Sequence, residues 1–218
     1  LHLSIRRQRQ MCIRDRTASA SSSSICSGGT TTLSLTGHTG TIQWQQSANG
    51  TSGWANVSGG TGATTDSYTT PNLTTTTFYR AVISSGTCTA LNSNVLTITV
   101  NTATAISVHP NTTAQSVCQG TALTALSVTA TGTSLTYQWY SNTTASTTGS
   151  TLITGATSAS YTPVNSTPSA LFYYCVVTGT CGTVTSNISA LRTVSATPVA
   201  GTASASSSSI CSGGTTTL

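Results

Sequence analysis

Hydrophobic and polar residues alternate in short runs along most of the chain. The alternation is clearest over residues 32–36, 41–45, 95–100 and 136–140, where Leu, Ile, Val, Trp or Tyr takes every second position and Thr, Ser or Gln fills most of the others. A period of two places one set of side chains on each face of a β-strand. Turns rich in Gly, Ser and Asn separate the runs, and no segment has the helical period. The pattern predicts an all-β fold of half-buried strands.

A long repeat sets the domain organisation. The seventeen residues of Thr17–Leu33 return unchanged as Thr202–Leu218, at an offset of 185 residues. An unchanged repeat of this length indicates one period of a longer array followed by the first strands of the next period. Since strands need a sheet to pack on, we expect the second copy to be poorly ordered or docked on a borrowed sheet edge.

A weaker repeat divides each period into two halves. Landmark residues recur in the same order at offsets of 92 to 95: Cys26 and Cys118, Trp44 and Trp139, Tyr68 and Tyr161, Tyr79 and Tyr173, Cys88 and Cys181. This spacing predicts two diverged copies of one domain, at residues 17–100 and 101–194, with a linker and the start of the next repeat at 195–218. About seven short strands in each copy favour an antiparallel β-sandwich.

The aromatic landmarks resemble those of immunoglobulin-like domains. Trp44 and Trp139 look like the buried Trp of strand C, and Tyr79 and Tyr173 look like the corner tyrosine of strand F, so the resemblance implies that all four anchor the cores. The Tyr-Gln-Trp and Gly-Thr-Cys motifs are similar to those of bacterial Ig-like repeats in large secreted and surface proteins, typical of Bacteroidota. The resemblance covers the chain from Thr17 onward.

The positive charge is concentrated at the beginning of the chain. Residues 1–16 hold five of the seven arginines, and the run from Arg6 to Arg16 resembles the translation of an adapter used in sequencing libraries, so we expect a non-native or disordered segment. Beyond it only Arg80, Arg192 and Asp66 carry charge, which gives a net charge of 2 − 1 = +1. We therefore expect no nucleic-acid partner. No apolar run reaches the roughly 20 residues of a membrane span.

Four cysteines are matched between the two domains and are disulfide candidates: Cys26, Cys88, Cys118 and Cys181. Pairing could occur inside each domain, as Cys26–Cys88 and Cys118–Cys181. In immunoglobulin strand order these partners lie at opposite poles of a sandwich, whereas a disulfide needs Cα atoms within about 7 Å. A bond from Cys26 to Cys181 across the joint is the alternative, and the sequence leaves both open.

Residues suited to catalysis or metal binding are scarce. Outside the first sixteen residues, His38, His109 and Asp66 are the only His, Asp or Glu side chains, and there is no Cys-x-x-Cys motif. We expect no enzyme activity, no metal and no cofactor. Cys175 has no counterpart in the first domain, and we interpret it as a small buried hydrophobic residue.

Trp54 and Tyr140 are the candidate platforms for a sugar ring, because an exposed aromatic face stacks on carbohydrate. The alternative for Trp54 is that it covers the edge of the sandwich core.

These features together predict a structural or adhesive stalk module of a long extracellular bacterial repeat protein, secreted or attached to the cell surface. Its partners would be neighbouring repeats of the same chain, surface glycans or other cell-surface proteins. One alternative is a carbohydrate-binding accessory module of a secreted hydrolase. Another is a filament subunit whose segment Thr202–Leu218 completes the sheet of a neighbour by strand addition.

Overall fold

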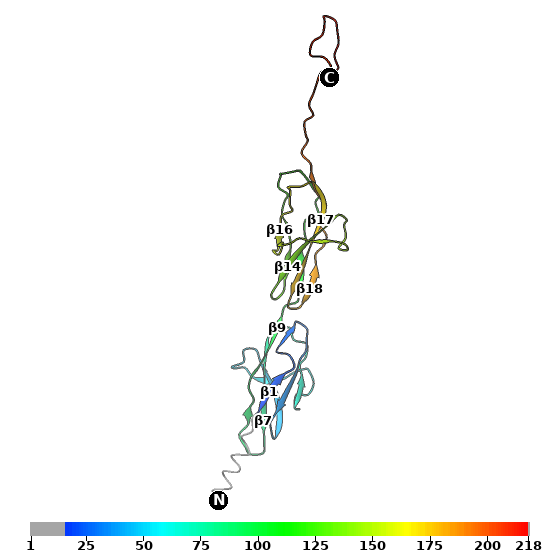
Figure 1. The fold of residues 1–218 in the computed structure, drawn as a ribbon. Coiled ribbons are helices and arrows are strands. Elements are labelled where there is room, and N and C mark those ends of the chain that lie inside the picture. The colour runs from blue at the N-terminus through cyan, green and yellow to red at the C-terminus, as the bar shows by residue number, and fades with distance from the viewer. Residues whose placement is uncertain (1–15, 218) are drawn as a thin grey trace.

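The chain folds into two β-sandwiches that lie end to end, as the computed structural model of residues 16–217 shows (Figure 1). Secondary structure within these residues consists of nineteen strands without a helix, which confirms the all-β prediction. The predicted foreign segment 1–16 lies outside the described residues except for Arg16.

The first domain contains two sheets. One sheet has the order β1-β3-β6, and the other has the order β2-β9-β7-β4-β5 with β8 paired to β7. The strands are β1 Thr17–Ala20, β2 Ser24–Cys26, β3 Thr32–Thr36, β4 Thr41–Ser47, β5 Ala55–Asn56, β6 Ser67–Thr69, β7 Thr77–Ser84, β8 Leu91–Asn92 and β9 Leu96–Asn101.

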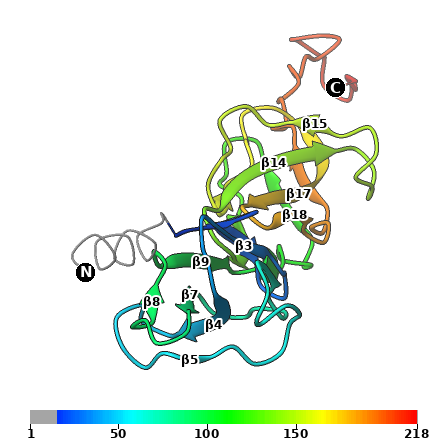
Figure 2. The same ribbon diagram turned by 90° about the horizontal axis from the view of Figure 1, so that it is seen from below.

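The second domain repeats this order. Its larger sheet runs β11-β19-β17-β14-β15 with β18 paired to β17, and its smaller sheet is interrupted into the pairs β10-β13 and β12-β16. The strands are β10 Ala105–Val108, β11 Gln115–Cys118, β12 Leu126–Ser127, β13 Thr129–Thr131, β14 Thr136–Asn142, β15 Thr151–Leu152, β16 Ser160–Tyr161, β17 Ser169–Gly179, β18 Gly182–Thr185 and β19 Arg192–Ser195. Figure 2 views both domains along the molecule.

The first strand of each domain passes from one sheet to the other. In domain one, β1 pairs antiparallel with β3, and the chain then crosses so that β2 runs parallel to β9. Hydrogen bonds at the crossing hold it: the Ser21 amide donates to the Thr32 carbonyl at 2.8 Å, and the Ser22 amide donates to Thr31 Oγ1 at 3.1 Å. β11 runs parallel to β19 in the same way. Each sandwich is therefore antiparallel apart from one parallel pairing, because one short segment serves both sheets.

A tryptophan lies at the centre of each core. Trp44 and Trp139 have no exposed surface, and each donates its indole N–H to a backbone carbonyl, that of Thr65 at 2.9 Å and that of Ser158 at 2.8 Å. Burial of an indole is favourable only when this donor finds an acceptor. The turn that supplies the acceptor is thus part of each core.

The core tyrosines are buried, and Tyr79 differs from the predicted corner tyrosine. Tyr79 is fully buried and Tyr173 is 3% exposed. The Tyr79 hydroxyl lacks a hydrogen bond of good geometry, whereas a corner tyrosine would bond to the backbone. Burial raises the pKa of both Tyr79 and Tyr173 to about 12, so both phenols are neutral at physiological pH. The role of these side chains is to fill the core.

The second copy of the repeated segment projects beyond domain two (Figure 1). Residues 202–217 are exposed throughout and form no strand. These residues therefore dock on no sheet edge of the described chain. They nevertheless repeat local features of residues 17–33. The Ser206 amide donates to the Thr217 carbonyl at 2.9 Å, as the Ser21 amide does to Thr32, and Gly213 has a positive φ of 85°, against 84° at Gly28.

Candidate functional site

The joint between the two domains is short and closely packed. β9 ends at Asn101 and β10 begins at Ala105, and Thr104 between them is 8% exposed. A Cβ atom on Gly179 would lie 2.5 Å from Thr104 Oγ1, and one on Gly132 would lie 3.2 Å from Thr104 Cα. These two glycines let loops of domain two close around the linker. The short linker and its packing therefore keep the two domains close together independently of any cross-link.

A disulfide crosses this joint. Cys26, at the end of β2, is bonded to Cys181, in the hairpin between β17 and β18, with the Cα atoms 5.6 Å apart. β2 brings Cys26 level with Asn101, the last residue of domain one before the linker. The Cys181 Sγ lies 3.7 Å from the Asn101 carbonyl, so the disulfide and the linker are neighbours.

The turn after Cys26 is fixed by the backbone. The Ser27 amide donates to the Asn101 carbonyl at 2.9 Å, and Gly28, at φ 84°, donates its amide to the Leu73 carbonyl at 2.7 Å. A positive φ at this position is adopted readily by glycine. Hydrogen bonds to the end of β9 and to the segment after β6 thus hold the cysteine at the pole of domain one.

Pairing within the domains, as Cys26–Cys88 and Cys118–Cys181, is wrong. The turn after β2 and the turn after β7 lie at opposite poles of a sandwich, so in-domain partners point away from each other while Cys26 meets the near pole of domain two. Cys88 lies exposed in the turn after β7, where its amide donates to the Ser85 carbonyl at 3.0 Å. Cys118 is a free thiol, exposed at the far pole of domain two.

Cys175 is fully buried on β17 opposite Trp139. Burial raises the pKa of its thiol to about 11, so the nucleophilic thiolate is scarce at neutral pH. This agrees with the interpretation of Cys175 as a hydrophobic core residue.

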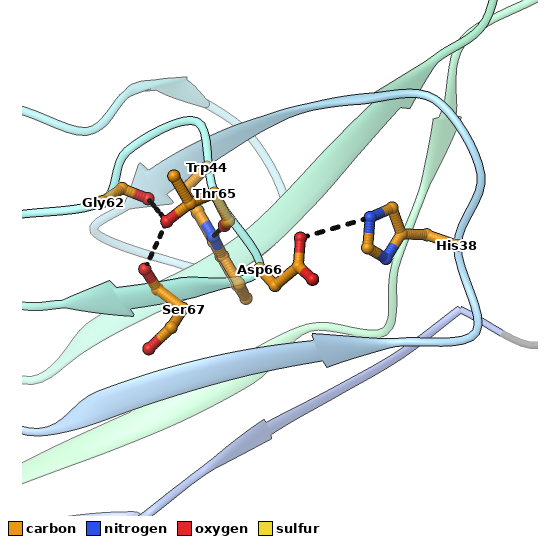
Figure 3. A network of polar contacts seen from close by, with 6 residues as sticks. All are labelled: His38, Trp44, Gly62, Thr65, Asp66 and Ser67. Atoms are coloured by element: carbon orange, nitrogen blue, oxygen red, sulfur yellow. Dashed lines mark hydrogen bonds and ion pairs between the residues drawn. The ribbon is translucent and has the colours of Figure 1, made fainter.

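One histidine and one carboxylate approach each other beside the core of domain one (Figure 3). His38 Nε2 lies 3.4 Å from Asp66 Oδ1, and the Asp66 side chain is 75% exposed. The turn that carries Asp66 is held by Thr65, whose hydroxyl donates to the carbonyls of Gly62 and Ser67 at 3.2 and 2.7 Å. The pair links the turn between β3 and β4 to the turn before β6.

Trp54 lies half-buried on the outer face of domain one. The Arg80 guanidinium stacks 4.2 Å from the centre of its ring, and Arg80 Nε and Nη2 both donate to Gln45 Oε1, at 3.0 and 2.9 Å. Trp54 is therefore outside the hydrophobic core, and one of its faces is occupied. An open hollow adjoins it, lined by Gln46, Ser47, Ala48, Gly53, Ala55 and residues 75–77.

Tyr140 lies on β14 at the position that Gln45 has on β4 of domain one. Its ring stacks on that of Tyr174, with centroids 5.2 Å apart and planes 7° from parallel, and the Tyr174 hydroxyl shares a 2.5 Å hydrogen bond with Ser150. One face of this candidate platform is also covered from within the molecule.

Arg192 is a buried charge that the sequence analysis did not single out. It is 2% exposed, and its Nη1 donates to Gln115 Oε1 at 3.0 Å, while Nε and Nη2 have no partner. Burial lowers the pKa of Arg192 from its ordinary value, and Tyr173 partly opposes this shift. The alternation of β19, in which Val194 faces inward, was the available signal, because it also turns Arg192 inward.

The described residues contain neither a metal-binding cluster nor a membrane-spanning helix. Across residues 16–217 no three His, Cys, Asp or Glu side chains are grouped to hold a metal ion. The same part of the chain has no helix long and apolar enough to cross a membrane.

Sequence comparison identifies the repeating unit. The profile of a family described as a domain of unknown function (DUF8696) matches residues 15–102 and again residues 110–195. The chain belongs to the DUF8696 family. It holds two tandem DUF8696 domains, each centred on one of the two sandwiches. No curated protein sequence matches the chain.

Solved structures show what fold DUF8696 domains adopt. An I-band fragment of titin is similar with a TM-score of 0.59 and 13% identity, over 84% of this chain and 65% of the titin fragment. Extracellular domains 3–5 of Drosophila OTK give 0.55 and 11%, over 83% and 60%. The eight N-terminal Ig domains of Down syndrome cell adhesion molecule give 0.53 and 11%, over 84% and 25%. The chain thus spans less than two thirds of each of these chains. At such identities the similarity shows the fold alone, and it confirms two tandem Ig-like sandwiches.

Proposed function

We propose that these two DUF8696 domains form a load-bearing stalk segment of a long extracellular repeat protein, secreted by or attached to the surface of a bacterium, the class that its motifs resemble. The end-to-end arrangement supports a spacer role, as does the long repeat at an offset of 185 residues. A disulfide supports an oxidising, extracellular location, because disulfides are rare where thiols are kept reduced.

The observation that carries this proposal is the Cys26–Cys181 disulfide. Cys26 lies near the beginning of domain one, and Cys181 lies near the end of domain two. Tension along the chain therefore passes from Cys26 through the disulfide to Cys181. Residues 27–180 lie in a covalent loop off this path. Such a joint lets a stalk bear load without extending residues 27–180.

Single-molecule force spectroscopy on the 218-residue chain, held by its two ends, tests this function. We expect the oxidised chain to extend by roughly 500 Å less than the Cys26→Ser variant, since 154 residues stay enclosed at about 3.3 Å each. Cys118→Ser is the matched control, because it removes an exposed thiol and leaves the cross-link. Equal extension of the oxidised chain and the Cys26→Ser variant would show that the joint bears no load.

Carbohydrate binding at Trp54 is the second candidate function. The observation that favours it is an open hollow lined by the chain neighbours of Trp54, Gly53 and Ala55, and by amide and hydroxyl groups that can bond to sugar hydroxyls. A glycan array with the intact chain and with Trp54→Ala tests it: binding should be lost in the variant and kept in Tyr140→Ala. Absence of binding by the intact chain would remove this function.

Strand addition by residues 202–218 receives less support. Residues 202–217 form several hydrogen bonds with one another, among them the bond from the Ser206 amide to the Thr217 carbonyl. A donated strand would first have to break these bonds.

A further inference from the structure

We infer that Cys118 is the site of a second interdomain disulfide, formed with the cysteine in the turn after the seventh strand of a DUF8696 domain that follows domain two. The inference rests on the proposed stalk function and extends it from one joint to a series of joints. Domain one supplies the comparison, since its Cys26 already forms such a bond.

The turn at Cys118 reproduces the turn at Cys26. The Gln119 amide donates to the Ser195 carbonyl at 2.8 Å, as the Ser27 amide does to Asn101 at 2.9 Å. Gly120 has a φ of 87°, against 84° at Gly28, and its amide donates to the Asn165 carbonyl at 2.9 Å. Both cysteines end a strand that runs parallel to the last strand of their domain. The two thiols are therefore presented in the same geometry.

Cys118 also lies where the next domain would attach. β11 places it level with Ser195, the last residue of β19, and the chain leaves domain two from this end (Figure 1). The first joint shows that a cysteine at this position is within reach of the adjoining domain, since Cys26 stands level with Asn101 in the same way. The exposed thiol thus faces the following joint.

The segment beyond this joint identifies the partner. Residues 202–217 have the sequence of the beginning of domain one and form the same hydrogen bonds, such as that from Gly214 to the Cys211 carbonyl at 2.8 Å, matching Gly29 to Cys26. A domain that begins in this way is of the domain-one type, in which the turn after β7 carries Cys88, the counterpart of Cys181. The linker at residues 196–201 is longer than the linker at residues 102–104, so by itself it restricts the relative motion of the two domains less. A disulfide would restrict that motion further.

Formation of this bond is a two-electron oxidation. Two S–H bonds break and one S–S bond forms, and the two electrons and two protons reduce the disulfide of a carrier, such as a thiol–disulfide oxidoreductase or oxidised glutathione, to a dithiol or two thiols. Exposure of Cys118 gives the carrier access.

A tandem chain tests the inference: residues 17–201 followed directly by a second copy of residues 17–201, which keeps the natural offset. Cys88→Ser in the first copy and Cys118→Ser in the second leave one Cys118 and one Cys88. After refolding with reduced and oxidised glutathione, peptides are mapped by mass spectrometry without reduction. We expect Cys118 linked to Cys88 and loss of its alkylation by N-ethylmaleimide, while Cys118 of the 218-residue chain is alkylated.

Three outcomes would overturn the inference. They are Cys118 alkylated as readily in the tandem as in the 218-residue chain, Cys118 linked to any other cysteine, and dimers linked through Cys118. In each case the mapped Cys26–Cys181 bond within each copy shows whether the domains have folded. Loss of the inferred bond with the Cys26–Cys181 bond intact would leave the stalk function standing.

Discussion

The two DUF8696 domains solve the same packing problem with different residues at two places. Position 98 in β9 holds a fully buried Ile, whereas the equivalent position in β19 holds Arg192, buried and bonded to Gln115. On the outer face, Gln45 lies opposite Arg80 in domain one, and Tyr140 lies opposite Tyr174 at the same register in domain two. A hydrogen-bonded Gln–Arg pair in domain one and a tyrosine stack in domain two thus occupy equivalent sites.

Other features are the same in both domains. Each buried Trp donates to a carbonyl, and β7 and β17 each have, at matching positions, an amide bonded to a serine hydroxyl: Ala81 to Ser93 and Cys175 to Ser186, both at 2.9 Å. Both serines pass the bond on to the next carbonyl at 2.8 Å. The fold therefore depends on hydrogen-bonded polar atoms around a central Trp, whereas the residues of the outer face vary between the domains.

Exchange of the core residues of β9 and β19 should have the largest effect. Ile98→Arg buries a charge without the glutamine partner that Arg192 has and removes apolar packing, so we expect domain one to lose about 5 kcal/mol of unfolding free energy. Arg192→Ile should be neutral or stabilise domain two by about 1 kcal/mol. Urea unfolding followed by hydrogen exchange of each domain's peptides measures both. A large loss in Arg192→Ile would show that the charge is needed in domain two.

Truncation of the central Trp should affect both domains alike. Trp44→Ala and Trp139→Ala each leave a cavity and an unpaired carbonyl, and we expect each to cost about 4 kcal/mol in its own domain. Thermal unfolding by calorimetry measures the cost, and Trp54→Ala, outside the core, is the control. A difference above about 2 kcal/mol between the two variants would contradict equivalent roles.

Removal of the serine hydroxyls should have an intermediate effect. Ser93→Ala and Ser186→Ala each leave a buried backbone N–H without an acceptor, which costs about 1–3 kcal/mol. Urea midpoints of the two variants give the values, with Ser23→Ala, at an exposed position just before β2, for comparison. If Ser186→Ala alone were neutral, the shared network would not be a requirement of the fold.

Exchange of the outer faces should change stability least. Arg80→Tyr with Gln45→Tyr gives domain one the aromatic stack of domain two, and we expect a change below about 1 kcal/mol, because exposed pairs of either kind contribute little. A shift in melting temperature of more than about 5 °C would show that the pairs are specific to their domains.

Much of this architecture follows from the sequence. Alternation located β3, β4, β9 and β14 within about two residues, because a half-buried strand imposes its period directly. The repeat spacing indicated two domains because it depends on no structural assumption. The alternation of β19 signalled that Arg192 faces inward, but the pairing of this charge with Gln115 depends on a residue distant in the chain. The covered face of Trp54 could not be predicted, since it depends on stacking by the distant Arg80. The choice of Cys181 as partner of Cys26 depended on how two domains meet, and the sequence left it open.

The two copies of the seventeen-residue segment separate the local from the tertiary contribution. Residues 17–33 and 202–217 form the same hydrogen bonds between their Ser and Thr residues and the same glycine turn. These short-range bonds and the positive φ at Gly28 and Gly213 require only neighbours in the chain. The first copy forms strands, buries Leu33 completely and carries the disulfide. The second, in the described structure, is exposed and pairs with no sheet. Strand pairing, burial and the disulfide were therefore decided by tertiary structure, since only a surrounding domain supplies the partner atoms and removes apolar surface from water.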